Sequence, residues 1–154
     1  MKDELVDDIV LRFARAAGKY RSLEEKPIAL ADGTRVFGSE MHMAVAVGEG
    51  LATTATALAH LCGVTKGAVS QTVKKLEAKG ILRREAAQGD EKTLLLALTD
   101  KGRELYRLHE RLHGANRPMF DRIRRKYDLR RLAEIREFLE DVERLLDAAG
   151  RGSA

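Results

Sequence analysis

Apolar residues recur at helical spacing over much of this chain, with polar residues between them. The first such stripe predicts an amphipathic helix, and it consists of Leu5, Ile9, Phe13, Ala16 and Tyr20. A connector around Pro27 follows, with an Asp-Gly turn inside it. We expect Ser39 to cap a second helix that ends among Gly48 and Gly50.

Two shorter helices and a hairpin should occupy the middle of the chain. One helix is expected to begin after Thr53 or Thr54 and to end at Gly63, and the next to have Thr65 as its N-cap and Gly80 as its stop. The apolar face of this second helix consists of Val69, Val73 and Leu76. The segments ILRREA and TLLLALT, separated by the polar AQGDEK, then predict two strands of a hairpin.

Two long amphipathic helices complete the pattern. Thr99 and Asp100 should open the first, which runs past Pro118 to Tyr127. Asp128 should cap the second, whose apolar stripe consists of Leu132, Ile135, Leu139, Val142 and Leu146. The sequence thus predicts a mainly α fold with one small β-hairpin.

Composition and charge narrow the class of protein. A chain of 154 residues that is 44% hydrophobic has an ordinary globular composition. Its net charge is only +4, but six basic residues and a single acid, Glu77, lie between Lys66 and Arg84, and this local excess suits a polyanion such as DNA. The lone Cys62 excludes an internal disulfide, fits a reducing cytoplasm, and should be packed in a turn. No apolar run approaches the ~20 residues that span a bilayer, and the first residues lack a signal-peptide pattern.

The segment from Ala55 to Thr72 has the spacing of a helix-turn-helix. Ala59 supplies the small residue where two helices cross, Gly63 the turn, and Val69 the β-branched residue that locks the second helix. The rest of this small core should consist of Leu58, Leu61, Val64 and Val73. An ordinary helical hairpin would show the same spacing, but the basic hairpin that follows favours a winged helix. Gly67 lies inside the predicted helix, where glycine costs ~1 kcal/mol relative to alanine. Its presence indicates that the backbone closely approaches another helix or a base edge.

With these elements in place, the chain resembles the MarR family of bacterial transcription regulators. The resemblance is carried by LAHLCGVTKGAVSQTVKKLEAKGIL, GDEK and LTDKGREL, and is strongest between Leu58 and Leu105. It implies a winged helix-turn-helix with N- and C-terminal dimerisation helices, in a homodimer that reads a pseudo-palindromic site. Alternatively, part of the apolar stripes of the first and last helices packs in the core of a single chain. The expected parts are a dimerisation helix with connector (1–38), a DNA-binding domain (39–99), further dimerisation helices (100–149) and a disordered tail (150–154).

Side-chain chemistry assigns roles on the expected DNA-contacting face. Thr65 and its helix N-terminus should touch phosphate, and Gly67 should leave room for this approach. Contacts to base edges are expected from Lys66, Ser70, Gln71 and Lys74, and contacts to the DNA backbone from Lys75, Arg83, Arg84 and Lys92. A solvated surface charge is the alternative for any one lysine. The family wing usually carries Asp-x-Arg, whereas Asp90 is followed here by Glu91 and Lys92, and lysine keeps the charge without the guanidinium fork.

Residues 109–113 read HERLH, which matches the H-E-x-x-H zinc motif of metalloproteases. A peptidase needs a third ligand and a cleft, and this segment falls inside a predicted regulator helix, so we expect no enzyme. By resemblance to the zinc-responsive branch of the family, a tetrahedral zinc site would comprise a carboxylate of Glu24 or Glu25 together with His42, His109 and His113. The alternative is that these histidines cap helices or lie on the surface.

The sequence therefore predicts a cytoplasmic, dimeric, sequence-specific regulator of transcription, a repressor that binds double-stranded DNA and is modulated by a small ligand or by zinc. A winged-helix module that binds protein is the first alternative, and it predicts little salt dependence, whereas phosphate contacts weaken steeply with salt. The zinc peptidase is the second, in which Glu110→Gln should abolish hydrolysis and leave DNA binding untouched.

Overall fold

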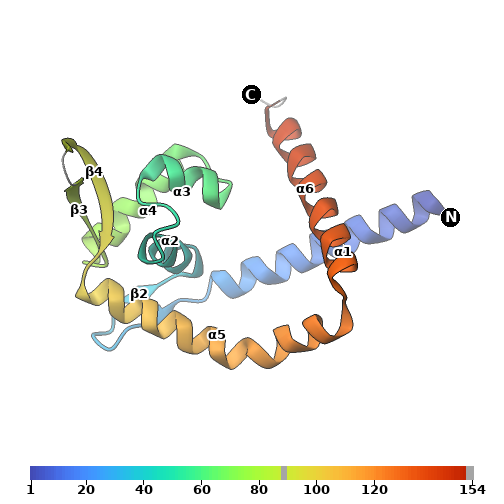
Figure 1. The fold of residues 1–154 in the computed structure, drawn as a ribbon, viewed down its shortest axis with the longest axis horizontal. Helices are drawn as coiled ribbons and strands as arrows, with labels where there is room; N and C mark the ends of the chain where they lie inside the picture. Colours follow the sequence, from blue (N-terminus) through green and yellow to red (C-terminus); the bar gives the residue numbers. More distant parts are fainter. Residues whose placement is uncertain (88–89, 152–154) are drawn as a thin grey trace. The chain divides into compact units, whose positions relative to one another are not determined.

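The computed structural model describes residues 1–87 and 90–151, including side chains except at 90–93, 115–116, 119 and 150–151. It comprises two compact units, Met1–Arg111 and Leu112–Ala154. The elements are α1 (Lys2–Glu24), β1 (Ile28–Ala29), β2 (Arg35–Val36), α2 (Gly38–Gly48), α3 (Ala55–Cys62), α4 (Lys66–Ala78), β3 (Leu82–Ala87), β4 (Asp90–Leu98), α5 (Asp100–Lys126) and α6 (Leu129–Arg151). The prediction of a mainly α fold with a small β-hairpin wing is confirmed (Figure 1).

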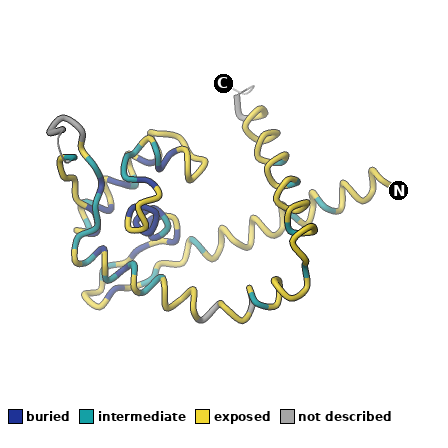
Figure 2. The backbone as a smooth tube through the Cα atoms, in the orientation of Figure 1, coloured by how far each residue is buried: buried dark blue, intermediate teal, exposed yellow. Residues whose placement is uncertain are grey.

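The core of the first unit is centred on α2. A helix that is apolar on all sides is normally buried, and most of α2 is buried, including Ala44 at 1% exposure. Buried residues of α3, α4, the wing and the start of α5 belong to the same hydrophobic cluster (Figure 2). The buried face of α4 packs in this cluster.

The helix caps are those that the sequence indicates, with one exception. Oγ1 of Thr65 accepts a hydrogen bond from the backbone amide of Ala68 at 3.2 Å, and α3, α5 and α6 are capped in the same way by Thr54, Thr99 and Asp128. The prediction that Ser39 caps α2 is wrong, because the helix begins two residues earlier than predicted, at Gly38 with Phe37 as its N-cap. The carboxylate of Glu40 accepts the amide of Phe37 at 3.0 Å, which is the half of a capping box that a glutamate at the third helical position supplies.

The helix-turn-helix core is smaller than the sequence predicts. Leu58, Ala59, Val69 and Val73 are buried as expected. Leu61 and Val64 are 51% and 41% exposed, and Cys62 is also exposed, so the prediction that these three pack inside is wrong. The left-handed backbone at Gly63 (φ 62°) turns the chain away after eight residues of α3, and only one side of so short a helix faces α4. Partial burial still raises the pKa of the Cys62 thiol, which opposes a role as a reactive redox sensor.

The connector forms a short antiparallel hairpin, β1–β2, that the sequence did not predict. Lys101 of α5 holds its turn, with Nζ 2.6 Å from Oδ2 of Asp32 and 2.7 Å from Oγ1 of Thr34. Glu104, one turn further along α5, accepts a backbone amide of the same turn at 3.2 Å. The hydrogen bond from Lys101, together with that from the Thr34 amide, lowers the pKa of Asp32 to about 2.

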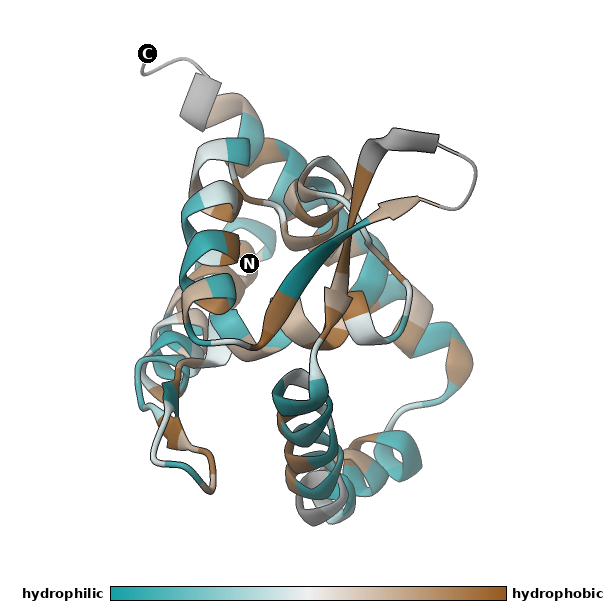
Figure 3. Cartoon of the chain, turned by 90° about the vertical axis from the view of Figure 1, so that its left-hand side faces the viewer, coloured by the Kyte–Doolittle hydropathy of each residue, from teal (hydrophilic) through white to brown (hydrophobic). Residues whose placement is uncertain are grey.

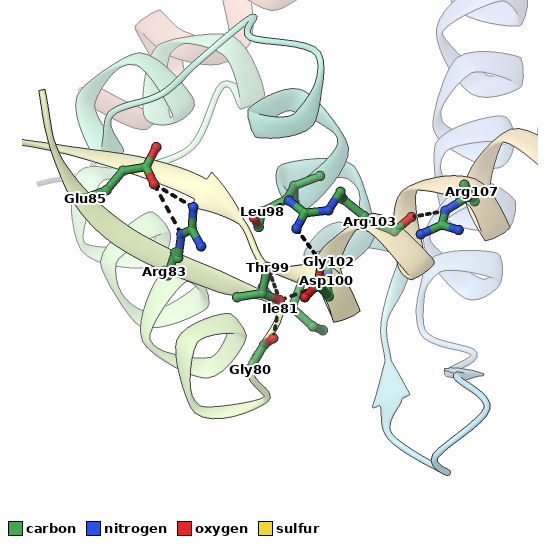
Figure 4. A network of polar contacts seen from close by, with 10 residues as sticks. All are labelled: Gly80, Ile81, Arg83, Glu85, Leu98, Thr99, Asp100, Gly102, Arg103 and Arg107. Carbon is green, nitrogen blue, oxygen red and sulfur yellow. Dashed lines mark hydrogen bonds and ion pairs between the residues drawn. The ribbon is translucent and has the colours of Figure 1, made fainter. Parts of the chain in front are cut away.

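The wing is fixed at its root by hydrogen bonds around Thr99 (Figure 4). Its hydroxyl donates to the carbonyl oxygens of Gly80 and Ile81 and accepts the amide of Gly102 at 3.1 Å. A Cβ at Gly102 would lie 2.3 Å from the carbonyl oxygen of Ile81. Only glycine therefore allows α5 to begin this close to β3, and the start of α5 and the wing are joined.

The second unit consists of the C-terminal part of α5 and all of α6. Pro118 lies inside α5, as expected. Hydrophobic and hydrophilic residues alternate in bands along α6 (Figure 3), and several large apolar side chains are exposed, including Leu145 at 70%. The helix includes residues 150 and 151 of the predicted tail, and residues 152–154 lie outside the described part of the chain. None of the described helices is long and apolar enough to cross a membrane.

Candidate nucleic-acid interface

The two faces of α4 differ sharply in exposure. Val69, Val73 and Leu76 are each 0% exposed and anchor the helix to the core. The opposite face is exposed at every position predicted to contact DNA from this helix and its cap, namely Thr65, Lys66, Gly67, Ser70, Gln71, Lys74 and Lys75. An exposed polar face on a rigidly anchored second helix is the geometry with which helix-turn-helix proteins enter a major groove.

Lys79, by contrast, belongs to the fold and not to the exposed basic face. Its Nζ lies 2.6 Å from Oε2 of Glu40, whose side chain is only 7% exposed. The same ammonium group lies 5.6 Å from the centroid of the Phe37 ring. This contact joins the C-terminal end of α4 to the first turn of α2, so it fixes one end of the exposed helix. From the sequence, Lys79 is only one of the six basic residues between Lys66 and Arg84, and no local signal indicates its pairing with Glu40, which lies 39 positions earlier.

The arginines of β3 are exposed but already have acidic neighbours. Arg83 lies 2.8 Å from Glu85 on the same strand, and Arg84 lies 2.8 Å from Glu77 of α4. Exposed pairs of this kind contribute little to stability, so these guanidinium groups can exchange a carboxylate for a phosphate at low cost. Lys92, the predicted contact at the wing tip, lies outside the residues whose side chains are described.

A second group of predicted residues lies in the first unit, where side chains of α1, α2 and α5 meet. Oε1 of Glu24 is 2.9 Å from Nδ1 of His42, and the rings of His42 and His109 meet edge to face with centroids 5.8 Å apart. Gly38 allows this approach, because a Cβ there would lie 2.9 Å from Cα of Glu24. The structure therefore brings together one predicted carboxylate and two of the three predicted histidines.

The carboxylate of this group fits a metal ligand in one respect. Oε1 of Glu24 is buried and, despite its distance to His42, has no hydrogen-bond partner among the described residues. Such an atom calls for a partner, and a divalent cation beside imidazole nitrogens is one. In the described part of the chain, no three His, Cys, Asp or Glu side chains are grouped closely enough to hold a metal ion. His113 is exposed on the second unit, stacked on Phe120 with ring centroids 6.4 Å apart.

Comparison with known proteins relates this arrangement to a family. Residues 41–92, which include α3, α4, β3 and nearly all of α2, match the model of the MarR family. Members of this family are transcription regulators and not enzymes. The HERLH segment on α5 lies outside the matched residues. No curated protein matches the sequence.

Solved structures of MarR-family regulators share the fold over almost the whole chain. Streptococcus pneumoniae FabT in complex with DNA is 23% identical with a TM-score of 0.61, and the match covers 97% of this chain and 99% of FabT. The zinc-responsive Lactococcus lactis ZitR is 17% identical with a TM-score of 0.60, covering 92% and 99%. The zinc-dependent regulator AdcR, in its Zn(II)-bound state, is 19% identical with a TM-score of 0.61, covering 90% and 94%. At these identities the structures show a common fold for the MarR-type segment and the helices around it.

Proposed function

We propose that the chain is a homodimeric, sequence-specific DNA-binding regulator that represses transcription by occupying a pseudo-palindromic site. The observation that carries the proposal is the division of α4 into a buried valine and leucine face and an exposed lysine, serine and glutamine face. FabT, which has the same fold, binds DNA. In our proposal, α4 enters the major groove of one half-site and its partner copy enters the next.

The exposed face offers two kinds of contact. Gln71 can pair with adenine, and Lys66 or Lys74 with guanine, while Ser70 can bond to either kind of edge. Thr65, Lys75, Arg83 and Arg84 serve as contacts to phosphate, which supply affinity without sequence information. Lys92 completes the backbone contacts in this proposal.

The proposed dimer is supported by the apolar surface that a single chain leaves exposed. None of the 23 residues of α1 is buried, although Leu5, Leu11 and Leu23 are 60%, 56% and 65% exposed. In α6 the exposed side chains include Leu139, Leu145 and Leu146. A soluble monomer rarely leaves such stripes in water, and a second copy of the same helices would cover them.

Salt dependence of DNA binding tests the proposal against a protein-binding winged helix. Binding to a site selected from random DNA should weaken linearly on a log–log plot between about 50 and 200 mM salt, with each phosphate contact adding about 0.9 to the slope. Lys75→Ala should reduce the slope by about 2 per dimer, because each protomer loses one contact. Lys26→Ala, an exposed lysine after α1, is the control and should leave the slope unchanged. No selected sequence, or a slope near zero, would contradict DNA binding.

We further propose that the effector is zinc. The pair formed by Glu24 and His42, with His109 beside it, offers one oxygen and imidazole nitrogens of the kind that bind Zn²⁺. His113, one helical turn beyond His109 in the sequence, is the further ligand that the sequence predicts. Two proteins of the same fold, ZitR and AdcR, respond to or depend on zinc. Zinc would bind the buried Oε1 of Glu24, which has no hydrogen-bond partner among the described residues, and would fix α2 relative to α1.

Equilibrium dialysis against zinc, with metal content measured per chain, tests this site. The wild type should bind zinc, and His42→Ala and His109→Ala should each lose most of that binding. His60→Ala is the matched control, since His60 is exposed on α3. Equal zinc content in the His42 variant and the control would show that the metal lies elsewhere, and no zinc in the wild type would remove the site.

A further inference from the structure

The described glycines with an evident role in the fold are of two kinds. One kind has a positive φ at a turn, as Gly63 does. The other lies where a side chain would collide with a neighbouring element, as at Gly48, whose Cβ would be 2.6 Å from Cδ1 of Leu98. In both cases the fold itself requires glycine.

Gly67, in the first turn of α4, belongs to neither kind. Its φ is not positive, and a Cβ built there would meet only Oγ1 of Thr65, at 3.9 Å, which is ordinary contact. The sequence left two explanations open, close approach to another helix or to DNA, and the structure excludes the first within the described chain. Glycine is the least favourable residue in a helix after proline, so this position weakens α4 with no return in packing.

The surroundings of Gly67 indicate what approaches it. It is followed by the exposed Ala68, and exposed polar side chains lie on both sides of it in the sequence, those of Thr65, Lys66, Ser70 and Gln71. At two other helical glycines, Gly18 and Gly114, a Cβ would meet nothing within 4 Å. They lie on α1 and α5, helices that the family resemblance assigns to the dimer, so the described helical glycines without a role in the fold occur on expected contact surfaces.

We propose that Gly67 is a specificity-determining residue at which the backbone of α4 lies directly against DNA, with no side chain between them. The missing Cβ lets the first turn of α4 sink further into the groove, and this depth brings Ser70 and Gln71 within reach of base edges. The inference rests on the proposed function, because it assumes that this face of α4 contacts DNA. Glycine at position 67 would then strengthen DNA binding while it lowers the stability of α4.

Two substitutions test this opposition. Gly67→Ala and Gly67→Leu both introduce good helix formers into open space, so each should raise the thermal midpoint slightly, by about 1–3 °C. DNA affinity should fall about tenfold for Gly67→Ala and further for Gly67→Leu, because a larger group holds the helix further from the groove. Ala78→Gly, at the exposed far end of α4, is the control, and it should lower the midpoint and leave DNA affinity unchanged.

The outcomes separate this inference from the function on which it rests. If the wild type binds no DNA, the proposed function fails. If the wild type binds but Gly67→Ala and Gly67→Leu bind equally well, the function stands and Gly67 is not a point of close approach. Repeating the selection with Gly67→Ala tests the effect on specificity. A changed preferred sequence supports the proposal, whereas weaker binding to an unchanged sequence would show that Gly67 does not determine specificity.

Discussion

The contact between Lys79 and Glu40 leads to a prediction about how α4 is held in place. Replacing Lys79 with methionine keeps most of the side-chain volume and removes the charge. The carboxylate of Glu40, 7% exposed, would then retain, among the described residues, only the Phe37 amide at 3.0 Å. Breaking a fully buried ion pair from one side costs about 3–5 kcal/mol. Because the Lys79 side chain is 24% exposed, water reaches the contact, and we expect a loss of about 2–3 kcal/mol.

The partner substitution should cost less. Glu40→Gln leaves a neutral acceptor for the Phe37 amide and an ammonium group that can turn toward water, so we expect about 1–2 kcal/mol. The double variant should cost less than the sum of the two single variants, because no charge remains unpaired. DNA affinity should also fall in Lys79→Met, since the end of α4 is no longer fixed to α2.

Urea unfolding at one fixed protein concentration measures these costs, since dimer stability depends on concentration. Arg12→Ala is the control, because its ion pair with Asp8 joins side chains that are 72% and 48% exposed, and it should cost less than about 1 kcal/mol. The reasoning is refuted if Lys79→Met unfolds at the same urea concentration as the wild type. Strict additivity of the two single variants would equally show that Lys79 and Glu40 act independently.

Three further predictions concern the core, the dimer and pH. Leu76→Ala should lower the free energy of unfolding by about 2–5 kcal/mol in urea titrations, because Leu76 is 0% exposed; a change below about 1 kcal/mol would contradict its place in the core. Leu139→Glu should shift the mass measured by sedimentation from that of a dimer toward that of a monomer, 17.1 kDa. An unchanged dimer mass would show that α6 plays no part in the dimer. The pKa of Asp32 is lowered from 3.8 to about 2, so its contribution to stability is present above about pH 4 and is lost as pH falls toward 2. The stability difference between wild type and Asp32→Asn should therefore shrink over that range, and a constant difference would rule out this linkage.

Local signals in the sequence were sufficient for the helices and the wing. The caps at Thr65 and Thr99 and the burial of Val69 and Val73 depend on interactions within a few residues, and these predictions are confirmed. The prediction for Leu61 is wrong, because helical spacing states which residues share a face and not whether a neighbouring element covers that face. The short α3 has too few neighbours to cover it.

Long-range contacts could not be predicted in the same way. Lys79 and Glu40 are 39 positions apart, and Lys101 and Thr34 are 67 apart, so no spacing rule connects them. The open space around Gly67 likewise depends on which elements do not pass near it. The histidine site was suggested by a family resemblance, and the structure contributes the contact of Glu24 with His42 and the position of His109 beside them.

If the exposed face of α4 lies in a DNA groove, a cleaving reagent attached to that face should cut the DNA beside it. An iron chelate attached to Ser70→Cys, in a Cys62→Ser background because the native thiol is exposed, cuts DNA only near its point of attachment. We expect two groups of cuts on the selected site, one in each half-site and about 10 base pairs apart. Cuts scattered without position, or none on DNA that the protein binds, would show that α4 does not enter the groove.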